Sequence, residues 1–389
     1  MNDTTASKPV LPGREADSGS SQAPGPAPSR APSQGQSPLD ILGLGSAELA
    51  DAAALRLPKG SGLAGTIYSR AFATGRIETE GLGLSAATEA AWKERFGVGL
   101  LAVRRVVEEE GEFGSTSKAL LGTADGLGVE CVRIPMPPAP GGAARSTLCL
   151  SSQVGCRMAC AFCETGAGGL TRDLRAAEIV AQVLTTRILL GWDCNNIVFM
   201  GMGEPLDNLD EVARAIRVLM DRRGLSYGAE RITVCSSCPP GGVARLRDLG
   251  LKRLNLSISL NGGLDATRSA LMPVNRARGL DDLADELAAY SQRRNFVLAA
   301  NYCLLPGLND GIEEARGVAA FAARVGRVLV NLIPYNPGST PLSRAPTEEE
   351  IERFTGWLEA GGCHVRRRTR KGASIMAACG QLRAGDRPA

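Results

Sequence analysis

Three cysteines with the spacing Cys-x3-Cys-x2-Cys are the most chemically distinctive residues of the sequence: Cys156, Cys160 and Cys163. Thiolates at this spacing on one short loop can bind three corners of an iron–sulfur cube and leave the fourth iron without a protein ligand. Such an open iron can chelate the amino and carboxylate groups of S-adenosylmethionine and reduce it to a radical. A zinc knot would need four ligands in pairs, and structural cysteines do not cluster so tightly. The spacing therefore favours a four-iron cluster.

Polar residues at other predicted strand ends can bind the rest of such a cofactor. Strand 197–201 runs into Gly201-Met202-Gly203-Glu204-Pro205, where glycine backbone ends beside a carboxylate that can accept an ammonium group. An ordinary Gly-Pro turn is the alternative interpretation. Five further polar residues lie at or near strand ends: Ser236, Ser237, Ser257, Ser259 and Asn336. Their side chains can form hydrogen bonds with a ribose or a carboxylate, but each can equally cap a loop.

Two further cysteines stand apart from the three. Cys149 lies seven residues before Cys156, and Cys379 lies in Ala377-Ala378-Cys379-Gly380-Gln381-Leu382 near the C-terminus. A cysteine in a tail can be carried into a site, so one thiol can be a nucleophile and the other its partner; structural roles stay open for both. Six more cysteines are interpreted as core or incidental thiols: Cys131, Cys194, Cys235, Cys238, Cys303 and Cys363. Of these, Cys235 and Cys238 have the Cys-x2-Cys spacing of a redox pair.

Composition limits the remaining possibilities. The 389 residues are 44% hydrophobic, which is enough for one large core and a smaller domain, and no apolar run reaches the about 18 residues of a membrane span. Eleven cysteines without a signal segment indicate reduced thiols in the cytoplasm. The net charge of +3 means that nucleic-acid binding would need a local patch, such as the basic run 366–371. The single histidine, His364, excludes histidine-rich metal sites.

The elements that must position these residues follow a strand-then-helix rhythm. Six such units predict an α/β fold: a partial (βα)6 barrel, open because six units are too few for a closed eightfold one, with its site at the strand C-termini. The predicted strands are 147–152, 197–201, 231–236, 254–260, 297–304 and 328–333. The predicted helices are 176–190 after a cap at Asp173, 211–220, 243–249, 281–292 and 312–325. A last helix follows the capping box Thr347–Glu350.

Four regions follow from these patterns. Residues 1–37 have a Pro, Ser, Gly and Ala composition typical of a disordered tail. Residues 38–96 are predicted to form a small helical accessory domain, with helices at 47–55 and 63–73. Residues 97–144 are predicted to be a β-hairpin and linker region, and 145–385 the partial barrel with its cysteine-bearing tail.

Taken together, the motifs resemble the RlmN/Cfr family of radical S-adenosylmethionine RNA methyltransferases. The resemblance covers roughly residues 38–385 and rests on four motifs in order: 148–163, 201–206, 331–337 and 377–382. Shorter matches lie at 114–118, 129–135 and 271–275. The resemblance implies a [4Fe-4S] cluster on the three cysteines and S-adenosylmethionine bound by Gly203, Glu204, Ser237, Ser259, Leu260, Asn261 and Asn336.

The resemblance also implies a two-step reaction. Cys379 would be methylated by one S-adenosylmethionine, and a second would be cleaved to a 5′-deoxyadenosyl radical that takes a hydrogen atom from that methyl group. The thiomethylene radical would add to C2 of an adenosine in 23S rRNA, with tRNA as a further substrate. Cys149 would resolve the covalent link and leave a Cys149–Cys379 disulfide, and Glu130 would accept a proton. We expect an electron donor such as flavodoxin or ferredoxin, a monomer, and a cytoplasmic location.

Some positions depart from the family pattern. Asn261 replaces a histidine, Ser236-Ser237-Cys238-Pro239 replaces Ser-Thr-Ser/Cys-Gly, Glu164 replaces a serine or alanine, and Met376 replaces an aspartate. None removes a required group, but they leave open which RNA is modified, and whether at C2 or at C8 as in Cfr. A non-enzymatic RNA-binding module is disfavoured, because it would not need two chemical thiols.

Overall fold

The computed structural model describes residues 37–138, 141–142, 144–290, 296–339, 341–369 and 371–383. The predicted disordered tail lies outside these residues except for Ser37, as do the end of predicted helix 281–292 and Arg370 of the basic run. Within the described part of the chain, no helix has the length and apolar character needed to cross a membrane.

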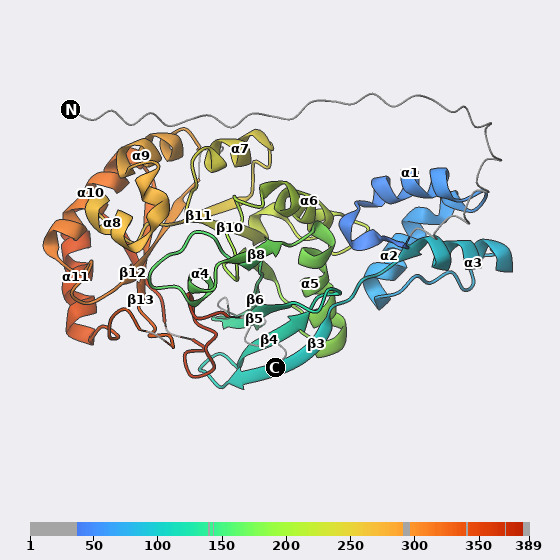
Figure 1. The fold of residues 1–389 in the computed structure, drawn as a ribbon, viewed down its shortest axis with the longest axis horizontal. Helices are drawn as coiled ribbons and strands as arrows, with labels where there is room; N and C mark the ends of the chain where they lie inside the picture. The colour runs from blue at the N-terminus through green and yellow to red at the C-terminus, as the bar shows by residue number, and fades with distance from the viewer. Residues whose placement is uncertain are drawn as a thin grey trace, which may run out of the picture. The chain divides into compact units, whose positions relative to one another are not determined.

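A ten-stranded sheet, in the order β14-β13-β12-β11-β10-β9-β6-β5-β4-β3, is the framework of the site (Figure 1). Its parallel strands are β6 (Arg145–Cys149), β9 (Asn196–Phe199), β10 (Ile232–Ser236), β11 (Asn255–Ser259), β12 (Leu298–Leu304), β13 (Val328–Pro334) and β14 (His364–Arg367). Helices follow the first six of these strands, which confirms the partial (βα)6 barrel. The edge strand β14 was not predicted, because its sequence His-Val-Arg-Arg is mostly polar and exposed.

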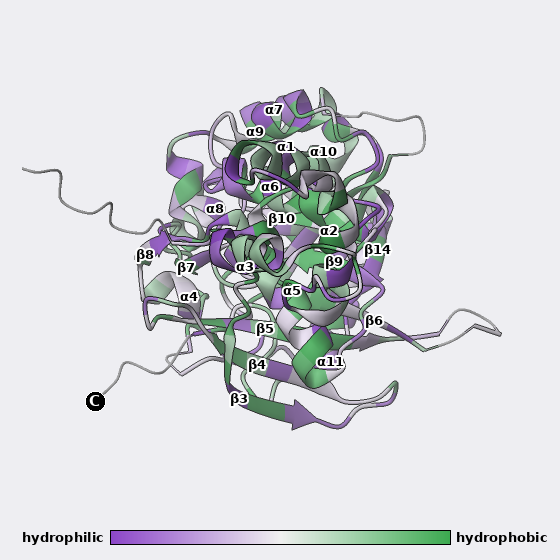
Figure 2. Cartoon of the chain, turned by 90° about the vertical axis from the view of Figure 1, so that its right-hand side faces the viewer, coloured by the Kyte–Doolittle hydropathy of each residue, from purple (hydrophilic) through white to green (hydrophobic). Residues whose placement is uncertain are grey.

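Six helices that cover this sheet lie close to their predicted positions: α5 (Ala176–Leu190), α6 (Leu209–Met220), α7 (Gly242–Asp248), α9 (Leu280–Ala288), α10 (Ile312–Val325) and α11 (Glu348–Ala360). A seventh, α8 (Asp265–Leu271), was not predicted, because its seven residues are too few to show a repeated apolar face. Figure 2 shows hydrophilic and hydrophobic stretches alternating on such helices, as amphipathic packing requires. The capping box is confirmed: Thr347 Oγ1 accepts from Glu350 N at 3.3 Å, and Glu350 Oε2 accepts from Thr347 N at 2.8 Å.

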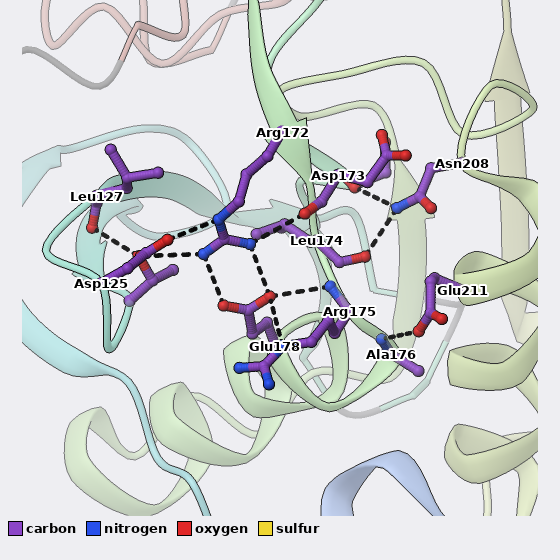
Figure 3. Close-up of polar contacts among 12 residues, drawn as sticks. Asp125, Leu127, Arg172, Asp173, Leu174, Arg175, Ala176, Glu178, Asn208 and Glu211 are labelled. Carbon is purple, nitrogen blue, oxygen red and sulfur yellow. Dashed lines mark hydrogen bonds and ion pairs between the residues drawn. The ribbon is translucent and has the colours of Figure 1, made fainter. Parts of the chain in front are cut away.

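The predicted cap of α5 was wrong. Its N-cap is Arg175, whose backbone N donates to Glu178 Oε2 at 2.9 Å, whereas Asp173 accepts from Gln153 Nε2 at 2.7 Å. Arg172 joins this helix start to a distant turn, with ion pairs to Glu178 at 2.8 Å and Asp125 at 2.7 Å (Figure 3).

That turn belongs to three antiparallel strands, β3 (Ala102–Glu109), β4 (Thr116–Gly122) and β5 (Gly128–Met136). The turn signals at residues 110–111 and 125–126 fall between them, as expected. β5 pairs antiparallel with β6, with Val132 opposite Cys149. The strands therefore continue the main sheet and place β5 directly beside a strand that carries a candidate catalytic thiol.

The segment before these strands contains the predicted helices as α1 (Ser46–Arg56) and α2 (Ala64–Thr74), followed by α3 (Ala86–Arg95). A short parallel pair, β1 (Leu39–Asp40) with β2 (Phe96–Gly97), closes the segment. Ile41 and Leu42 are fully buried in the same hydrophobic core as the apolar residues of α5. The segment therefore packs against the barrel helices α5 and α6, and Ser46 N at the start of α1 donates to Asp221 Oδ2 just after α6 at 2.7 Å.

Candidate active site at the strand ends

The loop that carries the three cysteines begins after β7 (Gln153–Gly155) and ends at α4 (Glu164–Ala167). Gly155 has a φ of 82°, and a Cβ on it would collide with the carbonyl oxygen of Gly169, so the turn requires glycine. Backbone hydrogen bonds fix the loop on both sides: Cys156 N donates to Gly169 O at 2.8 Å, and Ala161 N to Leu271 O at 2.9 Å. The loop therefore has a defined path before any ligand is bound.

The three thiols share one cavity at the C-terminal ends of the strands. Its other lining residues include Gly201, Gly203, Glu204, Cys235, Ser237, Ser259, Asn261, Asn301, Cys303, Cys379 and Gly380. The pKa of Cys156 is raised to about 12, mainly by burial and also by nearby Glu204 and Cys163. Burial also raises the pKa of Cys160, with a contribution from each of the other two thiols. Bound cationic iron would favour their thiolate forms.

This donor set fits a cluster with one open iron. Within the described residues, no group of three or more His, Cys, Asp or Glu side chains could hold a single metal ion. Three thiols around a common cavity suit a larger cubic cluster instead, since each binds a different corner. The remaining wall combines apolar side chains with the polar groups of Glu204, Ser237, Ser259 and Asn261, which suit the amino-acid part of S-adenosylmethionine.

Glu204 is the most thoroughly hydrogen-bonded group in the cavity wall. Its Oε1 accepts from Leu206 N at 2.9 Å and Ser236 Oγ at 2.6 Å, and its Oε2 accepts from Ser237 N and Ser237 Oγ, both at 2.8 Å. Burial raises the pKa of Glu204, while these hydrogen bonds lower it. The carboxylate therefore fastens the Gly201–Pro205 turn to the end of β10.

Replacing Glu204 with glutamine should destabilise the protein by about 2–3 kcal/mol. The amide NH2 would face donors that now bond a carboxylate oxygen, leaving buried groups unpaired. Urea unfolding measures the change, and Glu352→Gln on the exposed face of α11 is the matched control, expected within about 0.5 kcal/mol of the parent. Equal stability of the two variants would contradict this account of Glu204.

Arg268 on α8 is a buried residue of the site that sequence analysis missed. It is 2% exposed, and its guanidinium donates to Ser237 O at 3.1 Å, Ser259 O at 3.3 Å and Leu260 O at 3.0 Å. A fourth hydrogen bond, 2.6 Å long, goes to Asn275 Oδ1. Arg268 thus joins the ends of β10 and β11. The recognised 271–275 segment lies directly after it, and this was the available signal.

The residues expected to bind S-adenosylmethionine fall into three groups. Gly203, Glu204, Ser237, Ser259 and Asn261 line the cavity of the three thiols. Leu260 does not: its side chain is fully buried in the hydrophobic core, on the opposite side of the strand end from its neighbours. Asn336 lines an adjacent cavity instead.

Other polar residues at the strand ends make internal hydrogen bonds. Asn261 has a φ of 57°, and its Oδ1 accepts from Cys303 N at 2.8 Å. Ser257 Oγ lies 2.7 Å from Asn301 Nδ2, a contact inside the barrel. These bonds hold the cavity wall in place.

Cys379 lies where three cavities meet. The first is the cavity of the cluster cysteines; the second is an open, basic one that contains Asn336. The third also contains Cys149. Cys149 is buried and Cys379 exposed, and both are free thiols. The fold therefore brings together the two cysteines that sequence analysis singled out.

Glu130, the residue expected to accept a proton, is held by internal contacts in this structure. It is 1% exposed, forms an ion pair with Lys118 at 3.0 Å and accepts from Arg383 N at 2.8 Å. It lines none of the three cavities that Cys379 lines. Lys118 Nζ also donates to Met376 O at 3.0 Å. In this conformation Glu130 and Lys118 hold both sides of the segment that carries Cys379.

Further contacts fix the same segment. Glu164 N donates to Gly380 O at 2.8 Å, and Gln381 Nε2 donates to Pro337 O at 2.9 Å. In Figure 1 this dark red segment runs between α4 and the strands β3–β5. The side chain of Glu164, one of the departures from the family pattern, accepts from Ser339 N at 2.5 Å and Ser339 Oγ at 2.8 Å. It thereby joins the cluster loop to the loop after β13.

Known proteins share both the sequence and this architecture. Residues 150–319 match the model of the radical SAM superfamily. The chain is 41% identical to the probable dual-specificity RNA methyltransferase RlmN 1 of Protochlamydia amoebophila, over 69% of this chain and 73% of that protein. It is 42% identical to the dual-specificity RNA methyltransferase RlmN of Syntrophotalea carbinolica, over 69% and 70% of the two chains.

The crystal structure of a radical SAM methyltransferase from Sphaerobacter thermophilus superposes with a TM-score of 0.79 at 34% identity. The match covers 89% of this chain and 100% of that one. Identity of this extent, together with the shared fold and the cysteine-lined cavity, shows that the chain belongs to the RlmN family of the radical SAM superfamily.

Proposed function

We propose that the chain methylates C2 of an adenosine in RNA, with 23S rRNA as the main substrate and tRNA as a second one. The relatives named as dual-specificity RNA methyltransferases support the substrate class. The observation that carries the proposal is the position of Cys379, exposed at the junction of the cluster cavity and the cavity of Cys149. A methyl carrier needs access to both.

Each group of residues has a proposed task. Cys156, Cys160 and Cys163 hold the [4Fe-4S] cluster, while Gly203, Glu204, Ser237, Ser259 and Asn261 surround S-adenosylmethionine, with Asn336 reaching it from the adjacent cavity. When bound, the cluster and S-adenosylmethionine supply a carbon radical able to take a hydrogen atom from a methyl group.

The protein thiols carry out the rest. Cys379 carries the methyl group to the adenosine, whose C2 is too electron-poor for ordinary electrophilic methylation, and Cys149 then releases the product by forming a disulfide with Cys379. Glu130 can accept a proton only after the tail segment releases its carboxylate, because Lys118 and Arg383 N occupy it. Its proposed role in proton transfer therefore depends on movement of the tail.

RNA would approach Cys379 through the open, basic cavity. Arg366, Arg367, Arg368 and Lys371 line it together with the half-exposed ring of Phe113. Lys371 Nζ lies 5.4 Å from the centre of that ring. The cationic side chains can bind phosphates, and the aromatic ring can stack on a base. This combination is typical of sites that bind single-stranded RNA. We further propose a monomer in the cytoplasm that receives electrons from a flavodoxin or ferredoxin.

Nucleoside analysis tests the function directly. Digested rRNA and tRNA from cells that lack the gene should contain no 2-methyladenosine at the affected sites, and expression of the chain should restore it. Mass spectrometry with chromatographic standards separates 2-methyladenosine from 8-methyladenosine. Appearance of the 8-methyl isomer would instead indicate Cfr-type chemistry, and no change in either would contradict the proposal.

A further inference from the structure

We infer that Arg368 is a positioning residue for the thiol pair: its guanidinium stabilises the Cys149 thiolate that attacks the sulfur of Cys379. This inference rests on the proposed function, in which Cys149 releases the product. Cys149, Cys379 and Arg368 line the same cavity, and Arg368 is the only charged residue among the described residues that line it. The other walls are mainly apolar: Ile134, Met136, Val198, Met200, Ala377, Ala378 and Leu382.

The backbone places the guanidinium at this cavity. Arg368 follows the last residue of β14, and its backbone N donates to Leu332 O at 2.8 Å, which continues the pairing with β13. Its neighbour Arg367 forms an ion pair with Glu348 instead. Arg368 has no ion pair with any described residue, so its charge remains available to a thiolate.

Cys149 needs such a partner because its surroundings oppose ionisation. Burial raises its pKa, and the thiols of Cys379 and of Cys235 on β10 raise it further. Cys131 on β5, another buried thiol, also lies near enough to interact with it. Among the largest influences on this pKa, the backbone N–H of Met200 and the charge of Arg368 lower it. A buried thiol beside an arginine is a recognised arrangement for a reactive cysteine.

The chemistry assigned to the pair balances without an added oxidant. The Cys149 thiolate attacks the Cys379 sulfur of the Cys379–CH2–adenosine thioether, forming the S–S bond while the S–CH2 bond breaks. The bond's electron pair stays on carbon, which takes up the proton lost by Cys149 and becomes the methyl group. The two sulfurs are oxidised to the disulfide, and the carbon is reduced.

The test measures the thiol without relying on turnover. Full-length, cluster-loaded protein is alkylated with iodoacetamide across a pH series, and the peptide containing Cys149 is quantified by mass spectrometry. Arg368→Gln should move the midpoint of Cys149 alkylation up by about one pH unit, and Arg368→Lys should largely restore it. Arg366→Gln is the matched control: Arg366 lies on β14, two residues before Arg368, but does not line the two-thiol cavity, so the midpoint should stay unchanged.

A second readout links the thiol to the reaction. With S-adenosylmethionine, a reductant and RNA, Arg368→Gln should accumulate a covalent protein–RNA species near neutral pH and release it as the pH rises. An unchanged alkylation midpoint in Arg368→Gln overturns the inference even if RNA methylation continues. A shifted midpoint with no covalent species formed by the parent or any variant would instead overturn the proposed function, and with it the role of Arg368 in that reaction.

Discussion

Replacing Cys379 with alanine should lower RNA methylation by about 10³-fold or more, because the variant has no atom to carry the methyl group. Protein incubated with S-adenosylmethionine should show one added methyl on the peptide that contains Cys379, and Cys379→Ala should lose this label. Its fold should remain intact, because the Cys379 side chain is exposed and the neighbouring contacts of Gly380 and Gln381 involve other groups. Labelling with a methyl-tritiated cofactor measures the transfer.

Cys149→Ala should behave differently from Cys379→Ala. It can still accept the methyl group and attack the adenosine, but it has no thiol to break the S–CH2 bond, so it should accumulate as a protein–RNA adduct through Cys379. Denaturing gels with labelled RNA detect this species. Cys363→Ala removes a buried thiol that lines none of the Cys379 cavities and should retain activity and form no adduct. Turnover by Cys149→Ala without an adduct would overturn the assigned roles.

Local sequence patterns predicted six of the seven parallel strands and most helix ends, because each depends on nearby residues. The capping box at Thr347 needs only residues 347–350, and α10 needs only its own apolar face and flanking glycines. The pairing of β5 with β6 could not be predicted in this way. It is a long-range register choice, and an isolated hairpin would have shown the same alternation.

Functional residues divide along a similar line. The cluster cysteines were evident because their spacing on one loop is itself the signal. The clamp made by Glu130 and Lys118 was not, since its partners Arg383 and Met376 lie far away in the sequence. Leu260 was grouped with Ser259 and Asn261 by motif, although strand alternation would have placed it in the core. Arg268 was missed because three of its four partners are backbone carbonyls, which carry no sequence signature.

Substituting Cys156, Cys160 and Cys163 together with alanine should remove the cluster entirely. Anaerobically purified parent protein should contain about four irons and four sulfides per chain, with the matching visible absorption, and the triple variant close to none. Alanine is used because serine could supply an oxygen ligand in place of the thiolate.

The control must distinguish the loss of the three cluster cysteines from the loss of another thiol in the same cavity. Cys235 lines that cavity and belongs to a Cys-x2-Cys pair, yet its Sγ accepts a hydrogen bond from Asn301 Nδ2 at 3.2 Å. Cys235→Ala should therefore keep its full iron content. Loss of iron in Cys235→Ala, or retention of four irons in the triple variant, would contradict the ligand assignment. If Cys235→Ala retains its iron while the triple variant loses it, the spacing of the cysteines on the loop, rather than the number of thiols in the cavity, determines cluster binding.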